Sequence, residues 1–195
     1  GIIGTSACLA GIVARLLDEN QYQEAVDWAR RLASCFEPGD FYIELQDQGI
    51  VTDHGKTQHD LNVLLTKVAR EIGCKTIAAN DFHYLTHDDA TAQDLMLCIG
   101  TGSQVDDVKR MRFSSDQFYM KSEEEMREVM RDFPEACDNT VEIAEKCNVV
   151  LERDSILPRF PVPEGESEVS WFRHQCEEGL VKRYVEGKAT TFDEL

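Results

Sequence analysis

The stretch Thr76-Ile77-Ala78-Ala79-Asn80-Asp81-Phe82-His83-Tyr84 decides how the rest of the chain is interpreted. A short apolar run with β propensity stops abruptly, and an aspartate and a histidine follow two positions apart. If the run is an interior parallel strand, its end places both side chains at the carboxyl edge of the sheet, where α/β enzymes carry their chemistry. In extended backbone, residues two apart project to the same side. We therefore expect Asp81 and His83 to reach one common point.

A carboxylate and an imidazole together suit zinc, manganese or iron, so this pair is a candidate metal site. The motif is short, and an aspartate that caps a turn beside an incidental loop histidine gives the same pattern. A third residue favours the metal interpretation. Cys8 follows the apolar segment 1–4 at the equivalent end of another predicted strand. It lies in a turn or at the start of a helix, where the thiolate form is favoured, although a structural cysteine under the turn is the alternative.

Hydrophobic periodicity predicts strands and helices that alternate along the chain. We expect strands near residues 1–4, 41–45, 76–79 and 149–151, and helices near residues 9–17, 22–36, 57–72, 87–99, 122–131, 134–147 and 171–184. Strand–helix–strand order is typical of parallel crossover units, so the fold class is α/β. It also puts Cys8 at the same sheet edge as Asp81 and His83.

Several residues mark where the helices begin and end. Thr57 with Asp60, and Ser122 with Glu125, are spaced as capping boxes. Thr5-Ser6 is a candidate N-cap, Pro134 a first-turn proline, and Gly73 and the Gly100-Thr101-Gly102 run candidate C-caps. The Gly-Thr-Gly run could instead cradle a phosphate. His54 and His59 flank a polar loop and are expected at the surface, as are the acidic side chains of Glu123-Glu124-Glu125.

The composition limits the function classes. The chain has 195 residues, 42% of them hydrophobic, with a formal net charge of −17 and a pI of about 4.6. This charge argues against a DNA-gripping surface on the chain itself, because phosphate contacts need clustered Lys and Arg. No apolar run is long enough for a membrane span, and no basic-then-apolar leader opens the chain. A start at Gly1, inside a predicted strand and without Met, indicates a piece of a longer protein.

Seven cysteines occur, without a close CxxC pair. This pattern indicates neither a disulfide framework nor a zinc ribbon, and it favours a reducing, cytoplasmic setting. Five of them are expected to be small buried side chains in or near helices: Cys35, Cys74, Cys98, Cys137 and Cys147.

A boundary is expected near the proline-rich segment Leu157-Pro158-Arg159-Phe160-Pro161-Val162-Pro163. Each proline disfavours a helix at the residue before it, so the segment is extended. We therefore divide the chain into residues 1–156, a linker over 157–168, and a final helical segment over 169–195. The apolar side of that helix includes Trp171, Phe172 and Leu180, and we expect it to pack on parts outside this chain.

Nearly the whole chain resembles the alpha subunits of bacterial DNA polymerase III, the replicative C-family polymerases. The resemblance depends on the number and order of several short stretches. These are Ser6-Ala7-Cys8-Leu9, Phe41 to Leu45, Ala79 to Tyr84, Asp94 to Ile99, Tyr119 to Met126, Asn139 to Ala144 and Leu157 to Pro161.

The resemblance implies more than the residue patterns do. It assigns residues 1–156 to the carboxyl-terminal half of a polymerase-and-histidinol-phosphatase (PHP) domain, a distorted β/α barrel, and residues 169–195 to the first helix of the polymerase core. It matches Cys8, Asp81 and His83 to ligands of a metal cluster that, in metal-competent members, supports 3′–5′ exonuclease proofreading. It places the remaining metal ligands before Gly1, and the polymerase aspartates that hold two magnesium ions after Leu195.

The resemblance also implies partners: DNA, bound through other parts of the full-length protein, the sliding clamp, and a separate proofreading exonuclease. No nucleic-acid-binding residue within this chain is predicted, and no membrane partner. Two other functions stay open. One is a stand-alone PHP phosphatase that acts on a small phosphate ester. The other is a metal-free structural platform within the polymerase.

Overall fold

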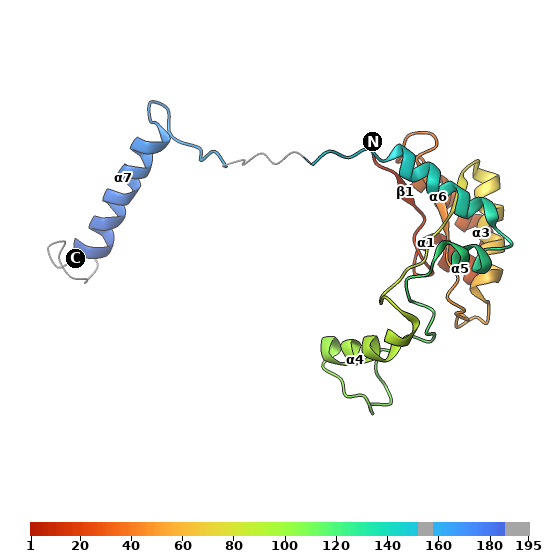
Figure 1. The fold of residues 1–195 in the computed structure, drawn as a ribbon. Helices are drawn as coiled ribbons and strands as arrows, with labels where there is room; N and C mark the ends of the chain where they lie inside the picture. Colours follow the sequence, from red (N-terminus) through yellow and green to blue (C-terminus); the bar gives the residue numbers. More distant parts are fainter. Residues whose placement is uncertain (152–157, 186–195) are drawn as a thin grey trace. The chain divides into compact units, whose positions relative to one another are not determined.

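The computed structural model describes residues 1–151 and 158–185 (Figure 1). The chain divides into two compact units, residues 1–148 and 149–195, and each is described by itself. The predicted division is into residues 1–156, 157–168 and 169–195. Its first boundary, and the end of its last segment, therefore lie outside the described residues. No helix in the described part of the chain is both long and apolar enough to cross a membrane.

The first unit is built on three parallel strands in the order β1-β2-β3. They are β1 (Gly4–Thr5), β2 (Phe41–Leu45) and β3 (Lys75–Ala78). Gly4 pairs with Phe41, and Tyr42 pairs with Lys75. The parallel α/β class is thus confirmed. The sheet is small and open among the described residues, so the distorted barrel stays a prediction.

Three helices form a layer on the sheet. Helices α2 (Tyr22–Ala33) and α3 (Gln58–Ile72) contact the strands, and α1 (Ile12–Asp18) packs on both of these helices. Alternate residues of β2 face them, and together they form the hydrophobic core. Its large buried members include Val13, Leu17, Val26, Phe41, Ile43, Leu45, Leu61 and Val68. A buried aliphatic or aromatic side chain contributes about 1.5–3 kcal/mol, so this layer is what holds β2 in place.

The other side chains of β2 turn away from that core. Tyr42 is fully buried and donates a hydrogen bond from Oη to Glu142 Oε1 of α6 (Pro134–Lys146), at 3.1 Å. Asn139 Nδ2 of the same helix donates to the Thr76 carbonyl of β3 at 2.7 Å. Helix α6 therefore fixes the strand that leads into Asp81 and His83.

The predicted helix ends are largely confirmed. Thr57 and Asp60 form a capping box on α3, and Ser122 and Glu125 form one on α5 (Glu123–Val129). Gly73 and Gly102 both adopt left-handed backbone conformations as C-caps, with φ of 76° and 66°. The Gly100–Gly102 run thus terminates α4 (Ala90–Thr101), as a C-cap does. A short 3₁₀ helix, η1 (His87–Asp89), precedes α4.

Some sequence predictions are wrong. Thr5-Ser6 does not cap the first helix, because α1 begins only at Ile12, after Gly11. The Ser6 hydroxyl instead accepts a hydrogen bond from the Glu44 amide at 2.9 Å. Residues 149–151 form no strand and are highly exposed. Cys35 and Cys147 are exposed rather than buried, whereas Cys98 and Cys137 are buried as expected.

The described part of the second unit contains α7 (Glu168–Leu180), followed by a π-helical turn over Val181–Val185. Ser167 caps α7 with its side chain. Residues 158–163 have neither helix nor strand, and the extended linker stays a prediction. The apolar side of α7 has little cover among the described residues, since Phe172 is 71% and Val169 76% exposed.

Candidate metal-binding edge

The carboxyl ends of the three strands lie at one edge of the sheet, because all three are parallel. The chain leaves β1 into the turn that holds Cys8 and leaves β3 into the segment that holds Asp81 and His83. Strand β2 lies between them, so the two outer strands are about 10 Å apart. Cys8, Asp81 and His83 thus follow strand ends at this edge, but the width of β2 separates Cys8 from the other two.

Asp81 and His83 are close together. His83 Nε2 lies 3.5 Å from Asp81 Oδ1, and about 40% of each side chain is exposed. The backbone differs from the one predicted: Asp81 has φ of 51°, in the left-handed region, so the extended conformation of β3 does not continue through Asp81. Aspartate tolerates this conformation better than most residues.

The segment that holds Asp81 and His83 is anchored on two sides. Gln48 Nε2 donates to the Asn80 carbonyl at 2.8 Å, and Asn80 Nδ2 donates to the Tyr119 carbonyl at 3.0 Å. The His83 amide donates to the Phe118 carbonyl at 2.7 Å. These bonds tie the segment after β3 to the loop after β2 and to the chain before α5. The Asp81–His83 geometry is therefore set by hydrogen bonds distant in sequence.

Aromatic rings pack around the imidazole of His83. Its ring centroid lies 4.8 Å from that of Phe113 and 5.6 Å from that of Phe118, both in edge-on arrangements. The two phenylalanine rings stack on each other at 4.5 Å. Packing of this kind restricts ring rotation, which leaves the imidazole nitrogens in a defined direction.

The donor pair fits one metal ion. Two ligand atoms about 2.1 Å from a tetrahedral ion stand about 3.4 Å apart, and the observed oxygen–nitrogen separation is 3.5 Å. Asp81 and His83 alone are too few for a protein site, which usually has three or four ligands. No group of three or more His, Cys, Asp or Glu side chains suited to a metal occurs within residues 1–151 and 158–185. The ligand set Cys8, Asp81 and His83 thus stays a prediction.

Cys8 lies in a tight turn rather than at a helix N-terminus, four residues before α1 begins. The Gly11 amide donates to the Cys8 carbonyl at 2.8 Å, and a side chain at Gly11 would meet the Ser6 carbonyl oxygen at 2.5 Å. Only glycine fits there. Ala7 adopts φ of 62°, which costs a non-glycine residue about 1–2 kcal/mol. The thiol is partly exposed.

Glu44 is a residue of this edge that the sequence analysis did not single out. Its Oε2 accepts a hydrogen bond from the Thr5 hydroxyl at 2.6 Å, and its Oε1 accepts one from Gln46 Nε2 at 2.7 Å. The carboxylate therefore sits on the central strand, between the chain segments that leave β1 and β3. A signal was present: Glu44 interrupts the otherwise apolar strand Phe41–Leu45.

The other candidate histidines are surface residues, as predicted. His54 Nδ1 pairs with Asp18 at 2.8 Å, and His59 Nε2 pairs with Asp132 at 3.0 Å, with each imidazole about half exposed. The hydrogen bonds from Thr52 and His54 lower the pKa of Asp18 despite its partial burial. Among the described residues, neither pair belongs to a group of three side chains that could hold a metal.

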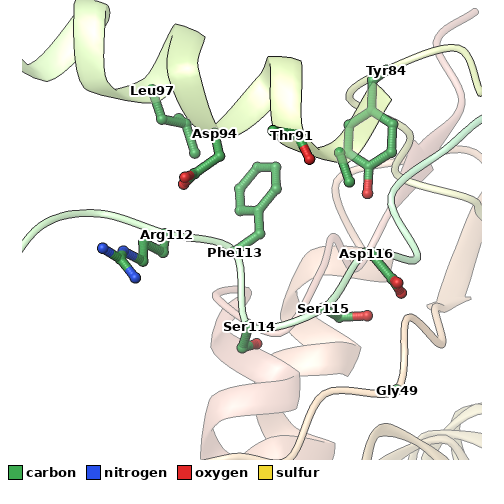
Figure 2. Close-up of a pocket in the computed structure, with 11 residues that line it drawn as sticks. Gly49, Tyr84, Thr91, Asp94, Leu97, Arg112, Phe113, Ser114, Ser115 and Asp116 are labelled. Carbon is green, nitrogen blue, oxygen red and sulfur yellow. The ribbon is translucent and has the colours of Figure 1, made fainter. Parts of the chain in front are cut away.

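A cavity of about 640 Å³ lies between α4 and the loop before Phe118 (Figure 2). In Figure 2 the Phe113 side chain points toward α4, near Thr91 and Asp94. None of Cys8, Asp81 and His83 lines it. It borders the candidate site through Phe113, which packs on His83, and through Tyr84, which follows His83 in the chain.

The chain has relatives among curated sequences. The relatives include the DNA polymerase III subunit alpha of Borreliella burgdorferi, 41% identical over 190 residues, and that of Treponema pallidum, 36% identical over 187 residues. That of Mycobacterium tuberculosis is 35% identical over 192 residues. The chain belongs to the DNA polymerase III alpha subunit family. No family model matches it.

The alignments with the DNA polymerase III alpha subunits cover nearly all of this chain but only a small part of each relative. The aligned regions cover 94%, 95% and 96% of this chain but 16% of each of the three relatives. The chain thus corresponds to one segment of a much longer alpha subunit. The aligned region necessarily includes most of the sheet edge described above.

Proposed function

We propose that this chain is the carboxyl-terminal half of the PHP domain, and the entry to the polymerase core, of a bacterial replicative DNA polymerase. In this proposal the full-length protein synthesises DNA in the cytoplasm. Its polymerase site, with two magnesium ions, lies in other parts of the protein. The support is the family membership together with the order of β1, the Cys8 turn, β2, β3 and the Asp81–His83 segment.

We further propose that Asp81, His83 and Cys8 bind zinc, manganese or iron, and that this site serves 3′–5′ exonuclease proofreading. The observation that carries the proposal is the 3.5 Å separation of the Asp81 and His83 donor atoms, which suits a shared ion. A bound ion would activate water for attack on a phosphodiester. The protein's own contribution is to hold the two donors in place through the Asn80 and His83 backbone bonds.

The remaining ligands would come from parts of the barrel outside this chain, because no third suitable side chain joins Asp81 and His83 in the described residues. Cys8 stands two strands away, so a cluster of more than one ion suits its position better than a single ion. The proposed partners are DNA, the sliding clamp and a separate exonuclease. None of them is expected to bind through the acidic surface of this chain.

The test uses the full-length subunit with Asp81→Asn and His83→Ala. Loss of an outer hydrogen-bonding partner of a metal site typically costs 10–100-fold in metal affinity or activity, so loss of a direct ligand should cost at least about that. We expect less bound metal by elemental analysis and weaker 3′–5′ exonuclease activity, with primer extension retained. His59→Ala with Asp132→Asn is the matched control, because it removes another exposed Asp–His pair.

Unchanged metal content in both variants would disprove the metal site. If the subunit binds no metal, but its stability and primer extension depend on this domain, the result favours the structural platform. The stand-alone phosphatase is disfavoured, because the relatives named above are all polymerase subunits and are far longer than this chain.

A further inference from the structure

The carboxylate of Glu44 lies on the face of β2 opposite the hydrophobic core. Side chains alternate across a strand, so Glu44 projects away from Ile43 and Leu45, which are fully buried in that core. Glu44 itself is partly buried, and burial of an ionised carboxylate is unfavourable unless the group is well bonded. The backbone ladder already joins β2 to both of its neighbours. Strand pairing therefore does not explain Glu44, and exceptions of this kind are expected at functional sites.

Both oxygens of this carboxylate have hydrogen-bond donors. Oε2 accepts from the Thr5 hydroxyl at 2.6 Å, and Oε1 accepts from Gln46 Nε2 at 2.7 Å. Hydrogen bonds to a charged group are roughly twice as strong as those between neutral groups. The Glu44 side chain is thus held from two sides, and it holds the Thr5 side chain in turn.

Glu44 is bonded to two consecutive residues of the chain that leads from β1 to Cys8. Its carboxylate binds Thr5, and its backbone amide donates to the Ser6 hydroxyl at 2.9 Å. Thr5 Oγ1, which donates its proton to Glu44, also accepts from the Ala7 amide at 3.4 Å. Glu44 therefore fixes the backbone and the side chains directly before the Cys8 turn.

The Cys8 turn is strained next to these bonds. Ala7, directly before Cys8, has φ of 62°, a conformation that is unfavourable for a residue other than glycine. Such a conformation persists only when the surrounding structure imposes it. The bonds from Glu44 to Thr5 and Ser6 are contacts of that kind. Without them the turn can relax, and the Cys8 thiol moves with it.

We infer that Glu44 is a positioning residue for Cys8: through the Thr5 hydroxyl, its carboxylate holds the thiol where it can bind a metal ion. This inference depends on the proposed role of Cys8 as a ligand. Residues that orient a ligand without touching the metal typically contribute 10–100-fold to metal affinity. The carboxylate of Glu44 has this effect on the ion that Cys8 binds.

The test is cobalt(II) binding by the full-length subunit. A thiolate ligand gives cobalt a strong charge-transfer absorption in the near ultraviolet, so a titration reports the ion bound by Cys8, and Cys8→Ser identifies the band. We expect Thr5→Val and Glu44→Ala each to weaken this binding about tenfold, and the double variant to lose no more than either single variant. Thr5→Ser keeps the hydroxyl and should keep the wild-type affinity. Thr52→Val is the matched control, because Thr52 Oγ1 also donates to a carboxylate at 2.6 Å, that of Asp18 in α1.

The outcomes separate this inference from the proposed metal site. Wild-type cobalt affinity in Thr5→Val and Glu44→Ala overturns the inference and leaves Cys8 as a ligand. An equal loss in Thr52→Val or Thr5→Ser overturns it as well, because the effect would then not depend on the Thr5–Glu44 bond. A wild-type spectrum without the thiolate band disproves Cys8 as a ligand, and this inference with it. If one of the two variants does not fold, the other provides the measurement, because each breaks the same bond from a different strand.

Discussion

Asp81 and His83 are close in a segment where the left-handed backbone of Asp81 interrupts the extended conformation of β3. The contact is half exposed, and exposed ion pairs contribute about 0–1 kcal/mol. A residue held in the left-handed region costs about 1–3 kcal/mol when the surrounding structure imposes it. The segment therefore gains no stability from the pair, and backbone strain of this kind is concentrated at functional sites. This balance supports the metal interpretation at the scale of single residues.

Glu142 is the residue whose titration should control how α6 is attached to the sheet. The hydrogen bond from Lys75, followed by those from Lys146 and Tyr42, lowers the pKa of Glu142 from 4.5 to about 2. When folding lowers the pKa of a carboxyl group, the ionised group stabilises the folded state at pH values above its pKa in the unfolded chain. This stabilisation is lost as the pH falls through the folded-state pKa. The contribution is therefore complete above about pH 4.5 and disappears toward pH 2.

We predict that Glu142→Gln weakens the attachment of α6 at pH 6 and removes most of its acid sensitivity between pH 4.5 and 3. Hydrogen exchange of the α6 amides in the full-length protein, corrected for intrinsic rates, provides the measurement. Glu145→Gln is the control, since Glu145 is an exposed residue of the same helix. Equal pH dependence of α6 protection in the wild type and in Glu142→Gln would show that Glu142 has no such role.

At the scale of elements, the sequence predicted helix ends well where the capping residue lies within a few positions of the backbone group that it binds. The Thr57–Asp60 and Ser122–Glu125 boxes and Gly73 mark helix ends correctly, because each acts within four residues. The Thr5-Ser6 cap failed, because Ser6 binds Glu44 on another strand. The strand predicted at 149–151 failed because apolar residues alone do not form a strand without a neighbour to pair with.

The candidate site likewise combines features that follow from nearby residues with contacts between residues far apart in the sequence. Its location followed from a strand end and a two-residue spacing, which are local features. Glu44, the anchoring of Asn80 by Gln48, and the rings around His83 depend on contacts between residues that are 30 or more positions apart. Such contacts leave no periodic signal in one sequence. The exposed face of α4 was likewise invisible, because its apolar residues look the same whether covered or open.

The proline-rich segment should behave as an exposed connection. Residues 158–163 have no regular structure, and Phe160 is 65% exposed. We predict that limited trypsin digestion of the full-length protein cuts first after Arg159, within the expected linker 157–168, whose first residue lies outside the described part of the chain. Arg131, 70% exposed next to α5, is the internal comparison. Resistance at Arg159 with early cuts inside α3 would count against the connection.

At the scale of the whole molecule, the described elements leave several surfaces unpaired. Each of β1 and β3 has β2 as its only strand neighbour among the described residues, and β1 has only two residues. Leu95, Met96 and Ile99 of α4 and the apolar side of α7 are also exposed among the described residues. An open strand edge offers unpaired backbone groups, and an open apolar face favours association. These features have a common explanation if the chain is one segment of a longer, closed structure.

We therefore predict that the 195-residue chain, made alone, associates and has no nuclease activity. Light scattering should show multimers, and thermal unfolding should be broad, because exposed apolar faces and short edges stabilise several arrangements rather than one. A site with Asp81 and His83 as its close donors should also bind zinc or manganese weakly. Hydrolysis of a 3′-labelled oligonucleotide with either metal should match that of the chain carrying Asp81→Asn. A monomer with one sharp transition, and metal-dependent hydrolysis that Asp81→Asn abolishes, would show that the segment is a complete enzyme.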